Sequence, residues 1–118
     1  MAKACVVLLA DTDTHEAMGR MANALTCAKD FVDAGDAAVL IFDGAGTKWV
    51  PELDAQDHRY HRIYAELQDH IAGACSYCAK EFGVKEKIES SPVKLLSEYH
   101  DHPRLHAYVS DGYQVLTF

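Results

Sequence analysis

Continuous apolar runs and stretches of helical periodicity alternate along the first third of the chain. Residues 4–10 and 37–43 are apolar at nearly every position, as expected for strands that are covered on both faces. Between these runs, apolar side chains recur at helical spacing up to about Asp33. Asp13 predicts the N-cap of this helix, and Glu16, three residues later, fits a capping box. The order of strand, helix and strand predicts a right-handed parallel unit of an α/β fold.

The pattern becomes less regular after the second predicted strand. Residues 44–46 predict a tight turn, residues 47–57 predict an irregular loop, and a helix resumes near Asp57. Residues 70–75 predict a short third strand, which is followed directly by a helix that ends at Gly83. The same apolar positions also fit one continuous helical stripe, because a glycine within a helix costs only about 1 kcal/mol.

The last third of the chain predicts two short helices and a closing strand. Residues 84–91 are polar and predict a connection, and Pro92 suits the first turn of a helix. A last short helix is predicted from Pro103 to Gly112, and residues 113–118 predict a strand. The inner faces of these two helices are expected to carry Val93, Leu96 and Tyr99, and then Leu105, Tyr108 and Val109.

Length and composition narrow the class of protein. A chain of 118 residues has room for one domain, expected to span residues 1–118, and its 49% of hydrophobic residues suffice for a core. The net charge of −7 argues against nucleic acid and against an anionic membrane as partners. No segment approaches the roughly 20 apolar residues of a membrane span, and no signal peptide is recognisable. We therefore expect a cytoplasmic protein with reduced cysteines that binds neither nucleic acid nor membranes.

Cys75 and Cys78 form a C-x-x-C pair at the predicted junction between the third strand and its helix. The free N–H groups at a helix start favour the thiolate, which is the reactive form of cysteine. Ligands of open α/β sheets also bind at the carboxyl ends of the strands, where this pair is expected to lie. The alternative is a pair of buried thiols, because alanines flank the pair and cysteine is often buried. Cys5 and Cys27 are expected to be ordinary core residues.

Several known thiol sites do not fit the pair. A thioredoxin-like site is a weak match, because the pair comes late in the chain, with no Trp before it and no Pro inside it. A cysteine-dependent phosphatase needs Arg six residues after the cysteine, where this chain has Glu81. A structural zinc site needs four converging ligands, and the chain has a single C-x-x-C. No metal or other cofactor is therefore expected, although a mixed site of Cys75, Cys78 and histidines remains open.

Histidines and turn residues give further candidates. His100 and His102, on either side of Asp101, are expected at the surface, and the alternative is a metal patch or a group that lowers a thiol pKa. The glycines after the second strand resemble a phosphate loop only faintly, and nearby acidic residues would repel a phosphate, so no flavin or nucleotide is expected. His15 and His70 are expected near the strand ends beside Cys75. The candidate pocket is expected to be lined by Asp11, His15, Gly44 and His70.

Residues 73–84 (GACSYCAKEFGV) carry the most specific resemblance to a known family. They place a cysteine at a strand end, eight residues before Gly83, and residues 112–115 (GYQV) match a final helix-to-strand step. Over essentially its whole length the chain resembles the DsrE/DsrF-like (TusD-like) family. The resemblance implies a three-layer, flavodoxin-like sandwich with a mostly parallel sheet of four to five strands, which assembles into trimers or hexamers. It also implies that Cys75 accepts sulfur as a persulfide from a donor protein and passes it to an acceptor protein.

Cys78 departs from the pattern of the best-known sulfur carriers, which usually have a small, non-nucleophilic residue at this position. A second thiol could attack a persulfide on Cys75, release sulfide and leave a disulfide. The expected function is sulfur handling, as a sulfurtransferase or sulfur carrier in which Cys75 carries the sulfur and Cys78 assists or resolves. Two alternatives stay open: a non-catalytic oligomeric module that binds a small ligand or metal, and a dithiol redox switch. We also expect a homo-oligomer, because the apolar residues of the 47–53 segment are expected to be exposed.

Overall fold

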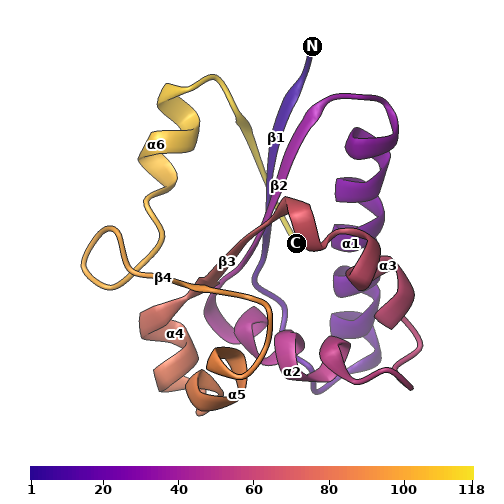
Figure 1. The fold of residues 1–118 in the computed structure, drawn as a ribbon, viewed down its shortest axis with the longest axis vertical. Coiled ribbons are helices and arrows are strands. Elements are labelled where there is room, and N and C mark those ends of the chain that lie inside the picture. Colours follow the sequence, from indigo (N-terminus) through magenta and orange to yellow (C-terminus); the bar gives the residue numbers. More distant parts are fainter.

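A sheet of five parallel strands forms the centre of the protein (Figure 1). The computed structural model describes residues 1–118, and its strands are β1 (Lys3–Leu8), β2 (Ala37–Phe42), β3 (Ile71–Cys75), β4 (Leu95–Leu96) and β5 (Gln114–Thr117). They lie in the order β4-β3-β2-β1-β5, and every neighbouring pair is parallel. The structure confirms the expected α/β fold, a three-layer, flavodoxin-like sandwich.

Helices cover the two faces of the sheet unequally. They are α1 (His15–Asp33), η1 (Gly44–Lys48), α2 (Trp49–Asp54), α3 (His61–Glu66), η2 (Gln68–His70), α4 (Ser76–Glu81), α5 (Lys85–Glu89) and α6 (Leu105–Ser110). The steps from β1 to β4 all move toward the same edge, so right-handed connections place α1 to α5 on one face. The return from β4 to β5 crosses the sheet in the opposite direction. Helix α6 therefore lies on the other face, away from α1 (Figure 1).

The hydrophobic core follows this division. On the face of α1, 17 buried residues form one cluster, in which Leu25 of α1 packs with Leu40 of β2. The opposite face has a buried cluster of four residues, which are Cys5, Val7, Ile41 and Leu96. Cys5 is thus a core residue, as expected, whereas Cys27 is half-buried at the edge of the larger cluster.

Helix α1 begins one residue later than its sequence signals suggest. Thr14, not Asp13, is the N-cap, and its Oγ1 accepts a backbone N–H of the first turn at 3.0 Å. Asp13 lies beside Lys48 instead, with its Oδ1 3.7 Å from Nζ. Glu16 pairs with Arg20 at 2.8 Å, one turn further along the helix. The predicted capping box of Asp13 and Glu16 is therefore wrong.

Helix α2 occupies a segment for which the sequence predicts an irregular loop. Trp49 and Leu53 are almost fully buried, and the Trp49 indole N–H donates to the carbonyl of Ala10 at 3.0 Å. Pro51 lies in the first turn, where its missing N–H costs no hydrogen bond. A helix of six residues depends on such tertiary contacts, which the local pattern does not show. The expectation that apolar residues of the 47–53 segment are exposed is therefore wrong.

The chain after α4 also differs from the prediction. Polar residues 84–91 contain helix α5, which is anchored by the fully buried side chain of Ile88. Instead of starting a helix at Pro92, the chain extends into β4, which pairs with the end of β3. Gly73 permits this pairing, because a Cβ atom at this position would lie 2.6 Å from the carbonyl oxygen of Lys94. The strand at β3 is confirmed, and the continuous helix is excluded.

Helix α6 packs on the thinly covered face of the sheet. Leu105 and Tyr108 contact the small cluster around Cys5, as predicted. Val109 is 59% exposed, so the prediction that it faces inward is wrong, because a helix of six residues turns only one narrow side to the sheet. Tyr99, predicted on a helix with Leu96, is also exposed and lies in a turn.

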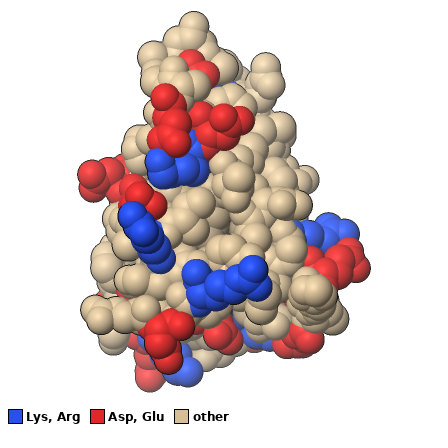
Figure 2. Space-filling model, turned by 90° about the vertical axis from the view of Figure 1, so that its right-hand side faces the viewer, with Lys and Arg blue, Asp and Glu red and all other residues tan.

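Charged side chains are spread over the surface rather than gathered by sign. On the face drawn in Figure 2, Lys and Arg lie next to Asp and Glu, with uncharged surface between them. The net charge of −7 therefore does not form a single acidic patch on this face. None of the helices combines the length and the apolar character that crossing a membrane requires.

Candidate functional site

Cys75 and Cys78 lie where β3 passes into α4, as the sequence predicts. Cys75 ends the strand and is the N-cap of the helix, and its Sγ accepts the backbone N–H of Cys78 at 3.4 Å. Parallel strands present their carboxyl ends at one edge of the sheet, so segments that follow β2 and β4 reach the same place. The two cysteines are therefore within reach of side chains from two further segments.

Asp43 and His102 complete a cluster of four side chains. Asp43 directly follows β2, and its Oδ1 accepts the Cys78 thiol at 3.5 Å. His102 lies between β4 and α6, and its Nδ1 is 3.2 Å from Cys75 Sγ. One side-chain N, O or S atom of each residue lies within 4.8 Å of the corresponding atoms of the other three. The cluster therefore joins one thiol to an imidazole and a second thiol to a carboxylate.

A turn with unfavourable backbone angles holds His102 in this position. Tyr99 and His102 exchange two backbone hydrogen bonds, of 2.9 and 2.8 Å. His100 and Asp101 between them have φ angles of 47° and 65°, in the left-handed region that favours glycine. The carbonyl of Asp101 accepts the N–H of Tyr77 at 2.8 Å, which ties the turn to α4. The Tyr77 and His102 rings pack together with centroids 4.8 Å apart, so the imidazole is fixed from two sides.

Burial governs the protonation of both thiols. Cys75 is fully buried, and this desolvation raises its pKa to about 12. Burial also raises the pKa of Cys78, although hydrogen bonds from Cys75 and Gly44 oppose the increase. The prediction of a thiolate at this junction is therefore wrong. The effect of burial on the thiol pKa outweighs that of the free N–H groups of a six-residue helix. Asp43 forms no ion pair, so no side-chain cation balances its charge.

A cavity of about 530 Å³ adjoins the cluster through Asp43 and His102. Arg104 and His106, both exposed, contribute basic side chains to its wall. The Arg104 guanidinium lies over the Tyr99 ring at 5.5 Å and forms no ion pair. The remaining lining residues are Pro103 and Leu105. Asp43 and His102 thus lie between the two cysteines and the basic and aromatic side chains of the cavity.

The four residues predicted to line a pocket do not come together. His70 directly precedes β3, and its Nδ1 contacts a backbone carbonyl of β2 at 3.3 Å. It therefore lies at the amino end of the strand, whereas Cys75 lies at the carboxyl end, and its predicted place beside the cysteine is wrong. His15 is the exposed first residue of α1. Gly44 donates its N–H to Asp43 Oδ1 at 2.9 Å and so supports the cluster through its backbone.

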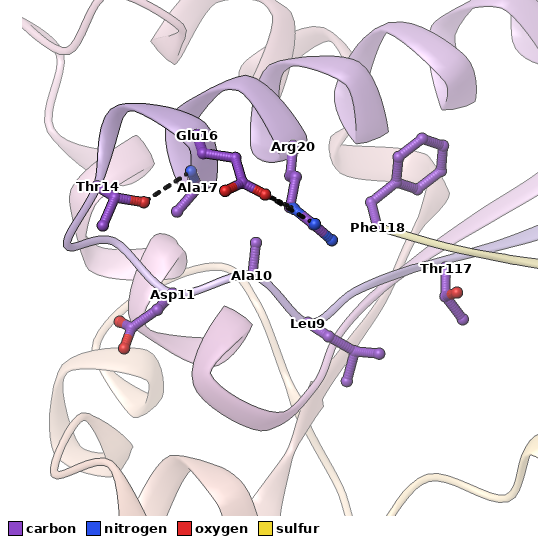
Figure 3. A pocket seen from close by; sticks show the side chains of 9 residues that line it. All are labelled: Leu9, Ala10, Asp11, Thr14, Glu16, Ala17, Arg20, Thr117 and Phe118. Carbon is purple, nitrogen blue, oxygen red and sulfur yellow. Dashed lines mark hydrogen bonds and ion pairs between the residues drawn. The ribbon is translucent and has the colours of Figure 1, made fainter.

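Asp11 belongs to a different cavity, of about 330 Å³, beside the start of α1 (Figure 3). Its carboxylate points away from the Glu16–Arg20 pair that lines the same cavity. It accepts a hydrogen bond from Lys48 Nζ at 2.7 Å, and this bond lowers the pKa of Asp11. The pair ties the loop after β1 to the end of η1, so Asp11 has a structural role.

Asp43 and His102 are the site residues that the sequence analysis does not place beside Cys75. Asp43 carries a usable signal, since it is a polar residue at the carboxyl end of a predicted strand next to the third one. His102 carries none of comparable strength, because β4 and the turn after it bring it back across more than 20 residues of chain. Its approach to Cys75 is a property of the tertiary structure.

Comparisons with known proteins give a fold and no function. No protein-family model matches the chain, and no curated protein matches it. Among solved structures, the conserved protein of unknown function BT1422 from Bacteroides thetaiotaomicron is similar, with a TM-score of 0.59. The match covers 97% of this chain and 94% of that chain at 20% sequence identity. At this identity, the likeness shows the fold alone.

Proposed function

We propose that the protein is a cytoplasmic sulfurtransferase or sulfur carrier whose Cys75 accepts sulfur as a persulfide. The 3.2 Å contact between Cys75 Sγ and His102 Nδ1 carries this proposal, because it pairs a nucleophile with a group that can take its proton. A thiol with a pKa of about 12 presents almost no thiolate at neutral pH without such a base. The resemblance of residues 73–84 to the DsrE/DsrF-like family supports the same role for Cys75.

The sulfur-accepting step conserves atoms and electrons. His102 takes the proton of the Cys75 thiol, and the thiolate attacks the outer sulfur of a donor persulfide. A bond forms between the Cys75 sulfur and this outer sulfur, while the sulfur–sulfur bond of the donor breaks. The donor leaves as a thiolate, which recovers the proton from His102. The product is a persulfide on Cys75, and the step needs no external oxidant or reductant.

Cys78 gives the persulfide on Cys75 two fates. In the first, the thiolate of an acceptor takes the outer sulfur by the same chemistry in reverse. In the second, Cys78 attacks the inner sulfur, sulfide leaves, and a disulfide joins the two cysteines. Asp43, 3.5 Å from Cys78 Sγ, is placed to take the proton of the attacking thiol and pass it to the departing sulfide. The second route reduces the transferred sulfur to sulfide and oxidises the two cysteines.

The sulfur donor has to reach an atom that is buried in the resting protein. We infer that it approaches through the cavity beside His102, where Arg104 would attract an anionic persulfide. Tyr77 and Tyr99, 46% and 54% exposed, flank His102 and offer apolar surface to a donor or acceptor protein. We further propose a homo-oligomer, a trimer or hexamer as the family resemblance implies, assembled through the thinly covered face of the sheet.

Intact-protein mass spectrometry after incubation with a low-molecular-weight persulfide tests this function. Reduced, metal-free wild-type protein is expected to gain one sulfur atom, and Cys75→Ser is expected to gain none. Cys78→Ser is expected to keep the added sulfur longer than wild type, because the resolving thiol is missing. Cys27→Ser is the matched control, since it removes a half-buried thiol that lies outside the cluster. Sulfur gain by Cys75→Ser at the wild-type level would overturn the proposal.

His102→Ala separates the role of the base from that of the nucleophile. We expect it to slow sulfur gain by roughly 100-fold, the lower range for loss of a general base. His15→Ala, at the exposed start of α1 and outside both the cluster and this cavity, is expected to leave the rate unchanged. A loss of two hydrogens that needs both cysteines, without any gain of sulfur, would favour a dithiol redox switch instead.

A further inference from the structure

Asp43, Cys75, Cys78 and His102 have the composition of a transition-metal site. We propose that these four side chains bind one divalent zinc ion. Zinc binding by this cluster does not depend on sulfur transfer. Thiolate sulfur, imidazole nitrogen and carboxylate oxygen are the three ligand types that zinc takes in proteins. The end of β2, the junction of β3 with α4 and the turn before α6 supply them together.

The distances fit a tetrahedral site. With metal–ligand bonds of about 2.0 to 2.3 Å, the atoms around a tetrahedral zinc ion lie about 3.3 to 3.8 Å apart. Cys75 Sγ and His102 Nδ1 are 3.2 Å apart, and Cys78 Sγ and Asp43 Oδ1 are 3.5 Å apart. All four atoms lie within 4.8 Å of one another. Small side-chain rotations are therefore enough to complete the coordination.

A cation would also give Asp43 the positive partner that it lacks. Asp43 is half-buried and forms no ion pair with a Lys or Arg side chain. The Oδ1 atom of Asp43 accepts the Cys78 thiol at 3.5 Å, so its partner in this structure is an uncharged group. A zinc ion would displace both thiol protons into solvent, and its two positive charges would offset the two thiolates. The carboxylate would then face a metal ion instead of a thiol.

The ligands are held in place before any metal arrives. The turn at Tyr99–His102 adopts left-handed backbone angles at His100 and Asp101, and its contact with Tyr77 fixes the imidazole with Nδ1 toward Cys75. Strained backbone of this kind persists at sites where the surrounding structure over-determines it. Simple packing of two buried thiols would account for the cysteines. It would leave unexplained why a carboxylate and an imidazole are both directed at them.

Metal binding and sulfur acceptance would use the same sulfur atom. Zinc would hold the Cys75 sulfur and lower its nucleophilicity, so the loaded protein is expected to accept sulfur from a persulfide donor more slowly than the metal-free protein. The two proposals can nevertheless fail separately. Metal titration requires no sulfur donor, and the sulfur assay is run on metal-free protein.

Cobalt(II) is the optical probe for this site, and zinc is its competitor. Reduced, metal-free, full-length protein is expected to bind one Co²⁺ per chain, with intense near-ultraviolet thiolate-to-cobalt absorption and the visible bands of tetrahedral cobalt. Zinc is expected to abolish both signals at one equivalent. Cys75→Ser and Cys78→Ser should each lose most of the thiolate absorption. His102→Asn and Asp43→Asn should each weaken cobalt binding at least tenfold, because each removes one of four ligands.

Two controls keep the test decisive. Cys27→Ser removes a thiol outside the cluster, and His106→Asn removes an imidazole from the same cavity, so both should bind cobalt as wild type does. If a cysteine variant fails to fold by circular dichroism, His102→Asn carries the test, since His102 is half-exposed. The absence of thiolate-to-cobalt absorption in folded wild-type protein would overturn the proposal. Unchanged cobalt affinity in both His102→Asn and Asp43→Asn would overturn it as well.

Discussion

Two effects of opposite sign act on the sulfur of Cys75. Its place at the start of α4 brings the N–H of Cys78 to 3.4 Å, and this contact favours the thiolate. Complete burial favours the neutral thiol, and burial is the larger effect, because it raises the pKa to about 12. A cysteine can thus occupy the position typical of reactive thiols and still depend on a neighbour for its reactivity. The neighbour closest to hand is His102, whose Nδ1 lies 3.2 Å from the sulfur and which we propose as its base or as a fellow metal ligand.

Cys5 shows the same burial effect in a residue that has no functional partner. Its side chain is fully buried, and this desolvation raises its pKa to about 11. Above pH 9 the unfolded chain loses the thiol proton while the folded protein keeps it, so stability is complete below pH 9 and falls as the pH rises toward 11. We expect this thiol to contribute about 2 kcal/mol to the loss by pH 11.

Urea unfolding of the reduced protein at several pH values between 7 and 11 measures this effect. The Cys5→Ala variant should start less stable at pH 7, because a small cavity replaces the sulfur. Its free energy of unfolding should then fall less steeply than that of wild type above pH 9. Parallel curves for the two proteins would contradict the prediction.

Gly46 and Gly19 make a matched pair for testing where glycine is required. A Cβ atom at Gly46 would overlap the carbonyl oxygen of Leu8 and lie 2.7 Å from its carbonyl carbon, whereas a Cβ at Gly19 would meet nothing within 4 Å. Gly46→Ala should therefore destabilise the protein by roughly 3 kcal/mol, since backbone has to move. Gly19→Ala, in the exposed surface of α1, should stabilise it by about 0.5 to 1 kcal/mol. Chemical denaturation of both variants checks the two signs, and equal effects would refute the steric argument.

At the scale of elements, the sequence predicts the helices and strands that a local pattern can specify. Strands β1 and β2 and helix α1 follow directly from apolar runs and helical periodicity, because each is long enough to carry a signal of its own. Helix α2 needs Trp49 and Leu53 to be buried against the sheet, and β4 is a strand only because it pairs with β3. Neither contact has a signature in neighbouring residues. Short elements that depend on such tertiary contacts are therefore the ones that sequence reasoning misses.

The candidate site likewise has a part that the local sequence predicts and a part that depends on tertiary contacts. The Cys75–Cys78 pair and its junction could be predicted, since the strand, the helix start and the pair are adjacent in sequence. The partners could not, because Asp43 and His102 reach the pair from separate segments. Proximity in sequence alone favours His70 as a partner, yet a strand of five residues separates it from Cys75. Residues that are close in sequence can thus lie at opposite ends of a strand, whereas residues from separate segments can meet at one end of the sheet.

The turn that carries His102 can be tested as an element. Asp101 has a φ angle of 65°, which glycine adopts freely and a β-branched residue adopts at a cost of roughly 1 to 2 kcal/mol. Asp101→Val should therefore lower the free energy of unfolding by about that amount, and Asp101→Gly should keep it within about 1 kcal/mol of wild type. The valine variant should also alkylate faster at Cys75, because the displaced turn no longer covers the sulfur. Thermal unfolding and thiol labelling measure both effects, and a valine variant as stable as the glycine variant would argue against strain in the turn.

At the scale of the whole molecule, the two faces of the sheet are unequally covered. Parallel sheets are normally buried on both faces. Here one face packs against five helices through 17 buried residues, while the other has α6 and a buried cluster of four. Val39, in the middle of the central strand β2, is only half-buried on the thin face. We therefore propose that a second copy of the chain covers this surface.

Sedimentation velocity of the wild-type chain and two lysine variants tests whether a second copy of the chain covers this face. Val39→Lys places a charge on the half-covered face, and Thr26→Lys adds the same charge to the exposed surface of α1 on the opposite side. We expect wild type and Thr26→Lys to sediment as one oligomer at micromolar concentration. Val39→Lys should sediment as a monomer, because a desolvated ammonium group opposes burial of the interface. A monomeric wild type would rule out the assembly, and an oligomer that survives Val39→Lys would move the interface away from this face. Because the turn carrying His102 leads directly into α6 on the same face, dissociation should also change the rate at which Cys75 accepts sulfur.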